Sequence, residues 1–107
     1  MKPQVIDHKD TWEEIMERNE SFFLLKHSLT CPISAAANNQ FERFVDQTDV
    51  PCYVLYVQKS RELSNYIAET YQVRHESPQA LYFKNGQVVW HDSHNAITSE
   101  RLKKTSE

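Results

Sequence analysis

Cys31 is placed where a thiol could act as a nucleophile. It lies between the apolar run 22–25 and a segment of high helix propensity, and Pro32 follows it directly. If Cys31 caps this helix and Pro32 is its first residue, the sulfur faces the free backbone N–H groups of Ile33 and Ser34. Those donors and the helix dipole favour a thiolate, the nucleophile of thiol–disulfide exchange. The alternative is a buried, inert thiol, which is the usual state of a free cysteine.

Cys52 is the second of the two cysteines. It begins an aromatic and β-branched segment typical of a strand, whereas Cys31 follows the end of the strand before. In a parallel pair these points lie at opposite ends of the sheet, one strand length or about 17 Å apart. A disulfide needs Cα atoms within about 7 Å. We therefore predict that the two cysteines do not pair and that Cys52 is a packed strand residue.

Pro78 follows a polar segment and immediately precedes a predicted strand. An X-Pro bond in such a turn is a candidate for the cis isomer, although a trans proline at a strand start is the commoner case. The chain must return here to the end of the sheet that carries Cys31. A cis bond would then place the backbone of Ser77 beside the sulfur, ready to pair with an extended thiol substrate.

Helices and strands alternate along the rest of the chain. Asp10 is the expected N-cap of the first helix, with Glu13 as its capping-box partner. Two strands joined by a helix should be parallel, and Asn85-Gly86 predicts a hairpin. The pattern predicts an α/β fold with a mixed four-stranded sheet and helices on both faces. The expected elements are a helix over 11–19, strands over 21–27 and 52–57, helices over 33–47 and 61–71, strands over 79–84 and 87–90, and a helix from Thr98 or Ser99.

Length and charge exclude several classes of protein. The 107 residues predict one domain over 1–107, and the net charge of −3 argues against a nucleic-acid partner. No apolar run approaches the roughly 20 residues of a membrane helix, and the first ten residues lack a secretory signal. We therefore expect a cytoplasmic protein without a membrane partner. The single glycine, Gly86, excludes glycine-rich phosphate loops.

The five histidines do not predict a metal site. His91 and His94 have two residues between them, and the others are scattered. This spacing matches no strong zinc pattern, and there is no Cys-x-x-Cys pair. We expect solvated or capping histidines and no bound metal.

The order of elements, the motif Thr30-Cys31-Pro32-Ile33-Ser34 and the Ser77-Pro78 step resemble the thioredoxin superfamily. More narrowly, they resemble its monothiol bacilliredoxin family, as do the stretches 24–28, 64–71 and 75–79. The resemblance implies a thioredoxin-like fold with an extra N-terminal helix. It also implies a thiol–disulfide oxidoreductase that removes bacillithiol from mixed disulfides on proteins.

The same resemblance implies roles for particular residues. Cys31 would be the catalytic nucleophile, and Ser34 stands where thioredoxins carry a resolving cysteine, so the dithiol route is closed. Bacillithiol would be a thiol co-substrate, with no bound cofactor, and the partners would be bacillithiolated proteins. Free bacillithiol or a partner reductase would reset the enzyme. Bacillithiol carries carboxylates, so Lys26, His27 and His94 are candidate charge partners. The implied substrate-binding residues are Thr30, Ser77, Pro78, His27 and His94.

Two other interpretations of the sequence stay open. One is a binding protein with a thioredoxin-like fold and no turnover, which would have an ordinary, shielded thiol. The other is an iron–sulfur carrier similar to monothiol glutaredoxins, with Cys31 and an external thiol as ligands. Pro32 and Ile33 argue against the carrier, because those proteins usually have glycine after the cysteine.

Overall fold

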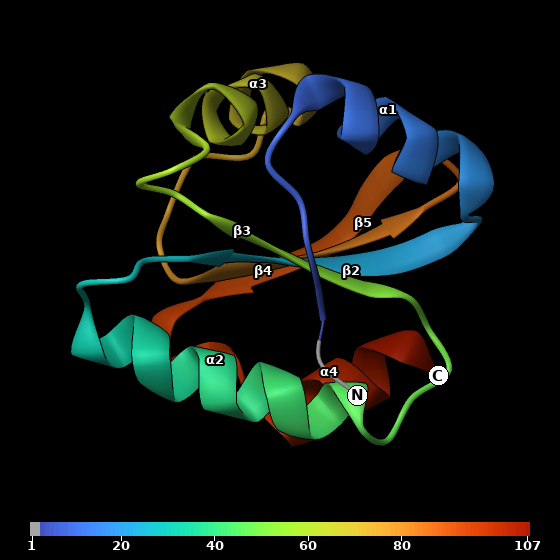
Figure 1. Ribbon diagram of the computed structural model, residues 1–107. Coiled ribbons are helices and arrows are strands. Elements are labelled where there is room, and N and C mark those ends of the chain that lie inside the picture. The colour runs from blue at the N-terminus through green and yellow to red at the C-terminus, as the bar shows by residue number, and fades with distance from the viewer. Residues whose placement is uncertain (1–2) are drawn as a thin grey trace.

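A mixed sheet lies between two layers of helices in the computed structural model, which describes residues 3–107 (Figure 1). The strand order is β1-β3-β2-β4-β5, with β1, β3 and β2 parallel and β4 and β5 antiparallel to their neighbours. Helices α1 and α3 cover one face, and α2 and α4 cover the other. The elements are β1 (Gln4–Val5), α1 (Lys9–Arg18), β2 (Ser21–His27), α2 (Pro32–Val45), β3 (Cys52–Tyr56), α3 (Arg61–Tyr71), β4 (Gln79–Lys84), β5 (Gln87–Ser93), a 3-10 turn (His94–Ala96) and α4 (Ser99–Ser106).

The sheet has five strands instead of the four expected from the sequence. The additional strand, β1, is two residues long and pairs with β3 through Gln4 opposite Tyr53 and Val5 opposite Val54. Both of its residues are exposed, so no alternation of apolar and polar side chains marks them. The remaining strands lie where the pattern predicted them, except that β3 ends at Tyr56, one residue earlier than expected, and β5 continues to Ser93.

Helix α1 begins earlier than its capping signal predicted. His8 is the N-cap, in an extended conformation, and Lys9 is the first helical residue. Asp10, predicted as the cap, lies in the first turn instead. A carboxylate is favourable in either place, since both lie near the positive end of the helix dipole, and the sequence signal does not separate them.

Strand β2 is central, and six of its seven residues are buried. Successive side chains point to opposite faces. Phe22 and Leu24 join the core under α1 and α3, where Trp12 packs edge-on against Phe22 at 5.5 Å between ring centroids. Phe23 and Leu25 join the core under α2 and α4. The same alternation sends the last two side chains of β2, both polar, to opposite sides of the sheet.

The hairpin between β4 and β5 turns at the predicted pair. Asn85 and Gly86 have φ angles of 53° and 79°, and two left-handed residues are what a tight type I′ turn requires. This turn lies at the end of the sheet away from Cys31. It fixes the register in which β4 pairs with β2, Ser21 opposite Lys84 and Lys26 opposite Gln79.

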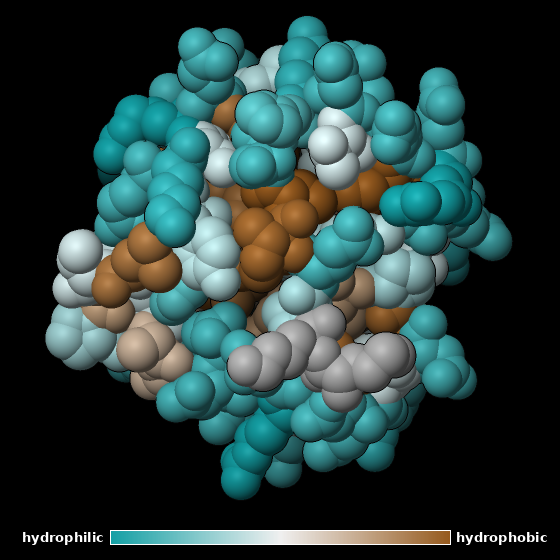
Figure 2. Space-filling model, viewed as in Figure 1, coloured by the Kyte–Doolittle hydropathy of each residue, from teal (hydrophilic) through white to brown (hydrophobic). Residues whose placement is uncertain are grey.

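The surface is mostly hydrophilic on the face shown in Figure 2. Its apolar side chains gather in a band across the middle, at the level of the sheet in Figure 1. Among residues 3–107, none of the helices combines the length and the apolar content that crossing a membrane requires.

Candidate active site

Cys31 is the N-cap of α2, as the sequence predicted. Its backbone is extended (φ −105°, ψ 121°), Pro32 is at the start of the helix, and the Cys31 carbonyl accepts the N–H of Ala35 at 3.1 Å. The side chain is half-buried and forms no disulfide. The sulfur accepts no capping hydrogen bond from the helix, so the thiol is placed at the positive end of α2 by the backbone alone.

Ser34, the third residue of α2, is fully buried. Its Oγ accepts the backbone N–H of Ser28 at 2.8 Å and lies 2.8 Å from Nδ1 of His27. These bonds tie the first turn of α2 to the end of β2. The position that a dithiol enzyme would give to its second cysteine is therefore filled by a fixed hydroxyl.

His27 points into the protein on the α2 side of the sheet. It is 8% exposed, and its ring lies 5.6 Å from the ring of Tyr56. Burial lowers its pKa below the ordinary value for histidine, and the carboxylate of Glu42 acts in the opposite direction. Nδ1 of the ring is thus hydrogen-bonded to Ser34 within the fold, and the predicted role of His27 in binding substrate stays a prediction. The alternation of side chains along β2 could have indicated that His27 faces α2, because it shares its face with Phe23 and Leu25.

Gln58 holds the loop that precedes Cys31, a contact that the sequence did not predict. Its Nε2 donates to Ser28 Oγ at 2.8 Å and to Thr30 Oγ1 at 3.3 Å, while its Oε1 accepts the N–H of Leu29 at 3.1 Å. Gln58 follows β3, the parallel neighbour of β2. The carboxyl ends of parallel strands lie at the same edge of a sheet. This rule could have predicted that Gln58 lies near the loop that follows β2.

The Ser77–Pro78 peptide bond is cis, and it lies just before β4. The Pro78 carbonyl accepts the N–H of His94 at 3.1 Å, so two of the predicted substrate-binding residues are joined directly. The Ser77 hydroxyl is buried and has no hydrogen-bond partner in the structure. The backbone around Pro78 is therefore fixed from the side of β5.

A hollow of about 220 Å³ lies between α2 and the 3-10 turn after β5. Ile33, which is 46% exposed, lines one side, and His94 and Asn95 line the other. Ile33 is two residues from Cys31. The hollow runs along the first turns of α2, the helix that begins directly after Cys31, and the role of His94 in binding the small thiol stays a prediction.

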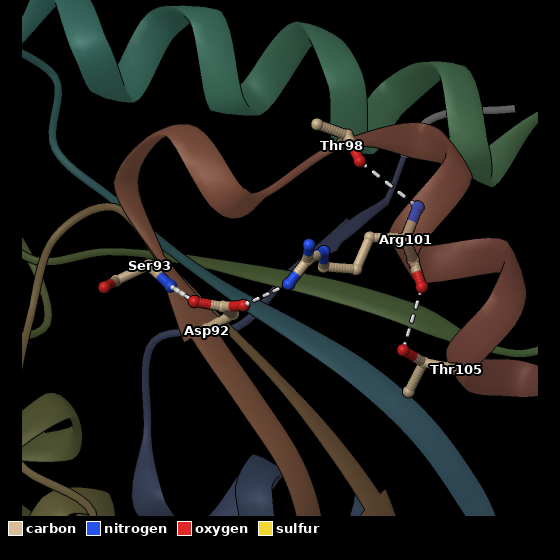
Figure 3. A network of polar contacts seen from close by, with 5 residues as sticks. All are labelled: Asp92, Ser93, Thr98, Arg101 and Thr105. Atoms are coloured by element: carbon tan, nitrogen blue, oxygen red, sulfur yellow. Dashed lines mark hydrogen bonds and ion pairs between the residues drawn. The ribbon is translucent and has the colours of Figure 1, made fainter.

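A network of polar contacts fixes both ends of the segment that carries His94 (Figure 3). The Arg101 guanidinium donates to the Asp92 carboxylate at 3.0 Å, which ties α4 to β5. Asp92 also accepts the N–H of Ser93 at 2.9 Å, and Thr98 caps α4 by accepting the N–H of Arg101 at 3.2 Å. His94, with a left-handed φ of 56°, lies between these anchors.

The family model for monothiol bacilliredoxin (BrxC) matches residues 4–102. The chain belongs to the monothiol bacilliredoxin family. A solved structure described as a candidate oxidoreductase with a thioredoxin fold is similar at 45% identity and a TM-score of 0.93, covering 98% of this chain and 94% of that one. Together, the family and the fold support a thiol–disulfide oxidoreductase role for this bacilliredoxin family member.

More distant structures agree on the fold alone. A thioredoxin mutant from Halobacterium salinarum is 18% identical with a TM-score of 0.78, covering 97% of this chain and 87% of that one. A thioredoxin from Malassezia sympodialis is 19% identical with a TM-score of 0.74 and the same coverage. The thioredoxin-like fold and the N-terminal helix predicted from the sequence are confirmed.

Lys26 ends in the opposite core from His27, under α3. It is 0% exposed, and its Nζ donates to the Ser64 carbonyl at 3.0 Å and lies 3.4 Å from Nδ1 of His75. Burial lowers its pKa to about 8. Lys26 therefore presents no charge at the surface, contrary to the expectation that it could pair with a substrate carboxylate. It supports the segment before Pro78 instead, since His75 lies in that segment.

Cys52 is buried at the start of β3, opposite Phe23 in the parallel register, whereas Cys31 follows the far end of β2. Its Sγ donates to the Val50 carbonyl at 3.2 Å, and burial raises its pKa to about 12. Both cysteines are free thiols, and Cys52 is a packed strand residue, as predicted. Over the described part of the chain, no three His, Cys, Asp or Glu side chains converge on a point that could hold a metal ion.

Proposed function

We propose that this protein is a monothiol bacilliredoxin, which removes bacillithiol from protein mixed disulfides through Cys31. The observation that carries the proposal is the pairing of a half-buried thiol at the start of α2 with a buried serine three residues later. The free backbone N–H groups and the dipole at a helix N-terminus are favourable for negative charge. Ser34 cannot resolve a mixed disulfide, so the intermediate must be resolved from outside.

The first step is an exchange at the bacillithiol sulfur. The Cys31 thiolate attacks that sulfur, the protein–bacillithiol S–S bond breaks, and the substrate protein leaves as a thiolate that takes a proton from water. A disulfide between Cys31 and bacillithiol remains. The thiolate of a second bacillithiol then attacks the bound bacillithiol sulfur, which releases bacillithiol disulfide and restores the Cys31 thiolate. No net electrons are gained or lost by the enzyme over the two exchanges.

The hollow beside Ile33 is the proposed site for the bound bacillithiol. It is within reach of the start of α2, and His94 on its far wall supplies a polar partner for a carboxylate of the small thiol. The backbone of Ser77, next to the cis Pro78, is the proposed contact for the protein substrate, because an extended chain can pair with backbone groups of the segment that precedes β4. The two proposed contacts are neighbours, since the Pro78 carbonyl accepts the N–H of His94.

The test uses a reporter protein whose single cysteine carries bacillithiol. Release of the reporter thiol is measured with wild type, Cys31→Ser and Cys52→Ser, using bacillithiol or glutathione as the resetting thiol. We expect release by wild type and Cys52→Ser, none above background by Cys31→Ser, and faster reset by bacillithiol. Equal release by Cys31→Ser would overturn the mechanism. Equal rates with the two thiols would overturn the choice of bacillithiol.

A further inference from the structure

The segment 72–78 joins α3 to β4 and carries the Ser77 backbone, the proposed contact for the protein substrate. Two buried side chains on neighbouring strands of the sheet lie next to this segment. Lys26, on β2, is opposite Gln79, on β4, in the antiparallel register. Both side chains lie on the α3 face of the sheet, because they alternate in step with the core residues Leu24 and Leu81.

These two side chains bond to consecutive residues of the segment. Gln79 Nε2 donates to the Arg74 carbonyl at 2.9 Å. Lys26 Nζ donates to the Ser64 carbonyl at 3.0 Å and lies 3.4 Å from Nδ1 of His75. The amine of Lys26 therefore joins the segment to β2 and to α3 at once.

The direction of the bond between Lys26 and His75 follows from their charges. With a pKa of about 8, Lys26 is mostly protonated at pH 7, and an ammonium group donates but cannot accept. Burial lowers the pKa of His75, and the positive charges of Lys26 and Arg61 lower it further. The carboxylate of Glu76 acts in the opposite direction. The ring of His75 is thus neutral at pH 7, and its Nδ1 accepts from the ammonium.

The hydroxyl of Ser64 is a second donor to the same nitrogen of His75. Ser64 Oγ lies 3.2 Å from Nδ1. The bond from Lys26 is the stronger of the two, because a hydrogen bond with a charged partner is about twice as strong as a neutral one. The position of His75 therefore depends first on the amine of Lys26.

The packing of the core does not need this amine. Lys26 is 0% exposed, and burying a charged group is unfavourable. The Oε1 of its neighbour Gln79 is also buried and has no hydrogen-bond partner in the structure. Apolar side chains of similar length would fill both places without these costs. What the two polar side chains share is the segment that they hold.

We propose that Lys26 is a positioning residue that acts through His75 and holds the segment 72–77 so that the Ser77 backbone is presented to an extended protein substrate. Ser77 is two residues after His75, so a displacement of the histidine reaches the substrate contact through two peptide units. Lys26 is fully buried and does not itself touch the substrate. The inference rests on the proposed function in taking the Ser77 backbone as the contact for the protein substrate.

The first measurement needs no substrate. Backbone order parameters of Glu76 and Ser77 are obtained from ¹⁵N relaxation at pH 7 for wild type, Lys26→Met, His75→Ala and the double variant. We expect a fall from about 0.85 in wild type to about 0.6 or below in both single variants. The double variant should match His75→Ala, because the two residues act in one chain of contacts. Lys84→Met makes the same change at an exposed lysine at the far end of β4 and should leave the order parameters unchanged.

The second measurement separates protein binding from the chemical step. With the bacillithiolated reporter as the varied substrate, we expect Lys26→Met and His75→Ala to raise KM about fivefold while kcat changes by less than about twofold. The bacillithiol concentration for half-maximal reset should stay the same, because the hollow beside Ile33 is lined by α2 and the residues after β5. Lys84→Met should leave all three quantities unchanged.

Unchanged order parameters at Ser77 in Lys26→Met would overturn the positioning role, with or without activity. Lowered order parameters with an unchanged KM would overturn its connection to the substrate, and additive effects in the double variant would overturn the path through His75. If Lys26→Met does not fold, His75→Ala replaces an exposed residue and carries the same comparison. Failure of the proposed function would look different, since wild type itself would then release no reporter thiol.

Discussion

Replacing Lys26 with methionine is expected to stabilise the protein at neutral pH. Lys26 is fully buried, its amine donates to the carbonyl of Ser64, and burial lowers its pKa from 10.5 to about 8. A lysine whose pKa is lowered in the folded protein reduces the free energy of unfolding at every pH at which the unfolded lysine is protonated, because the folded chain binds that proton less tightly. The shift corresponds to a penalty of at most about 3 kcal/mol at pH 7. Methionine matches the length of the lysine stem and carries no charge.

The net effect is smaller, because the Ser64 carbonyl loses a donor at a cost of about 1 kcal/mol. We therefore expect Lys26→Met to be more stable by about 2 kcal/mol at pH 7, a rise in Tm of about 8 °C for a chain of this size. Above about pH 8 the folded amine is neutral, and the extra proton that the unfolded chain binds is held less favourably as the pH rises, so the penalty falls between about pH 8 and 10.5. The advantage of the variant should vanish near pH 10.

Denaturant unfolding of both proteins between pH 6 and pH 10 measures this difference. Cys52 contributes an opposite slope above pH 9, since its raised pKa keeps the folded thiol protonated while the unfolded thiol ionises. That slope is common to both proteins and cancels in the difference. Lys26→Leu is a matched control. It also removes the charge, but its side chain is shorter than the lysine stem and fills the site less well than methionine. A Lys26→Met variant that is several kcal/mol less stable at pH 7 would refute the reasoning, since the amine's bonds would then outweigh its burial.

Three further predictions follow from individual contacts. Cys52→Ser should leave release of the reporter thiol unchanged, because the Cys52 thiol is buried and its pKa is raised to about 12. For the same reason, iodoacetamide at pH 8 should add one mass increment to folded wild type, on Cys31. Two increments would contradict this. Gln58→Ala removes three hydrogen bonds to the loop before Cys31. We expect the variant to release the reporter thiol about fivefold more slowly, with its unfolding free energy reduced by no more than about 2 kcal/mol. An unchanged rate would show that the loop is held without Gln58. His94→Ala should raise the bacillithiol concentration needed for half-maximal reset by about fivefold, because it removes the proposed polar partner of the small thiol, and Asn95→Ala is a neighbour control. A change in the reporter protein's KM with an unchanged bacillithiol requirement would contradict this and assign His94 to the protein substrate.

The sequence could predict the features that depend on short stretches of chain. The cap at Cys31 followed by a proline, the paired left-handed residues at Asn85 and Gly86, and the buried run of β2 each carry a local signal. From these the placement of Cys31 at the start of α2 and the hairpin of β4 and β5 follow, whereas the pairing of β2 with β4 joins segments distant in sequence and had no local signal. The two-residue strand β1 carries no such signal, because pairing with β3 is the only feature that makes it a strand.

The polar contacts of the site depend on residues that are distant in sequence, and they were not predictable to the same degree. The contact of His27 with Ser34 was not predicted, because it joins the end of β2 to the first turn of α2, and the substrate-binding role of His27 stays a prediction. Lys26 meets Ser64 across 38 positions of sequence. Gln58 had no motif around it, and its position at the carboxyl end of β3 matters only once the parallel pairing with β2 is known.

Intact mass spectrometry after incubation with bacillithiol disulfide tests the central claim most directly. The folded wild type is compared with Cys31→Ala and Cys52→Ala at equal concentrations. We predict a single bacillithiol adduct on wild type and on Cys52→Ala, and no adduct on Cys31→Ala. An adduct that is absent from wild type, or that is lost only in Cys52→Ala, would contradict the assignment of Cys31 as the nucleophile.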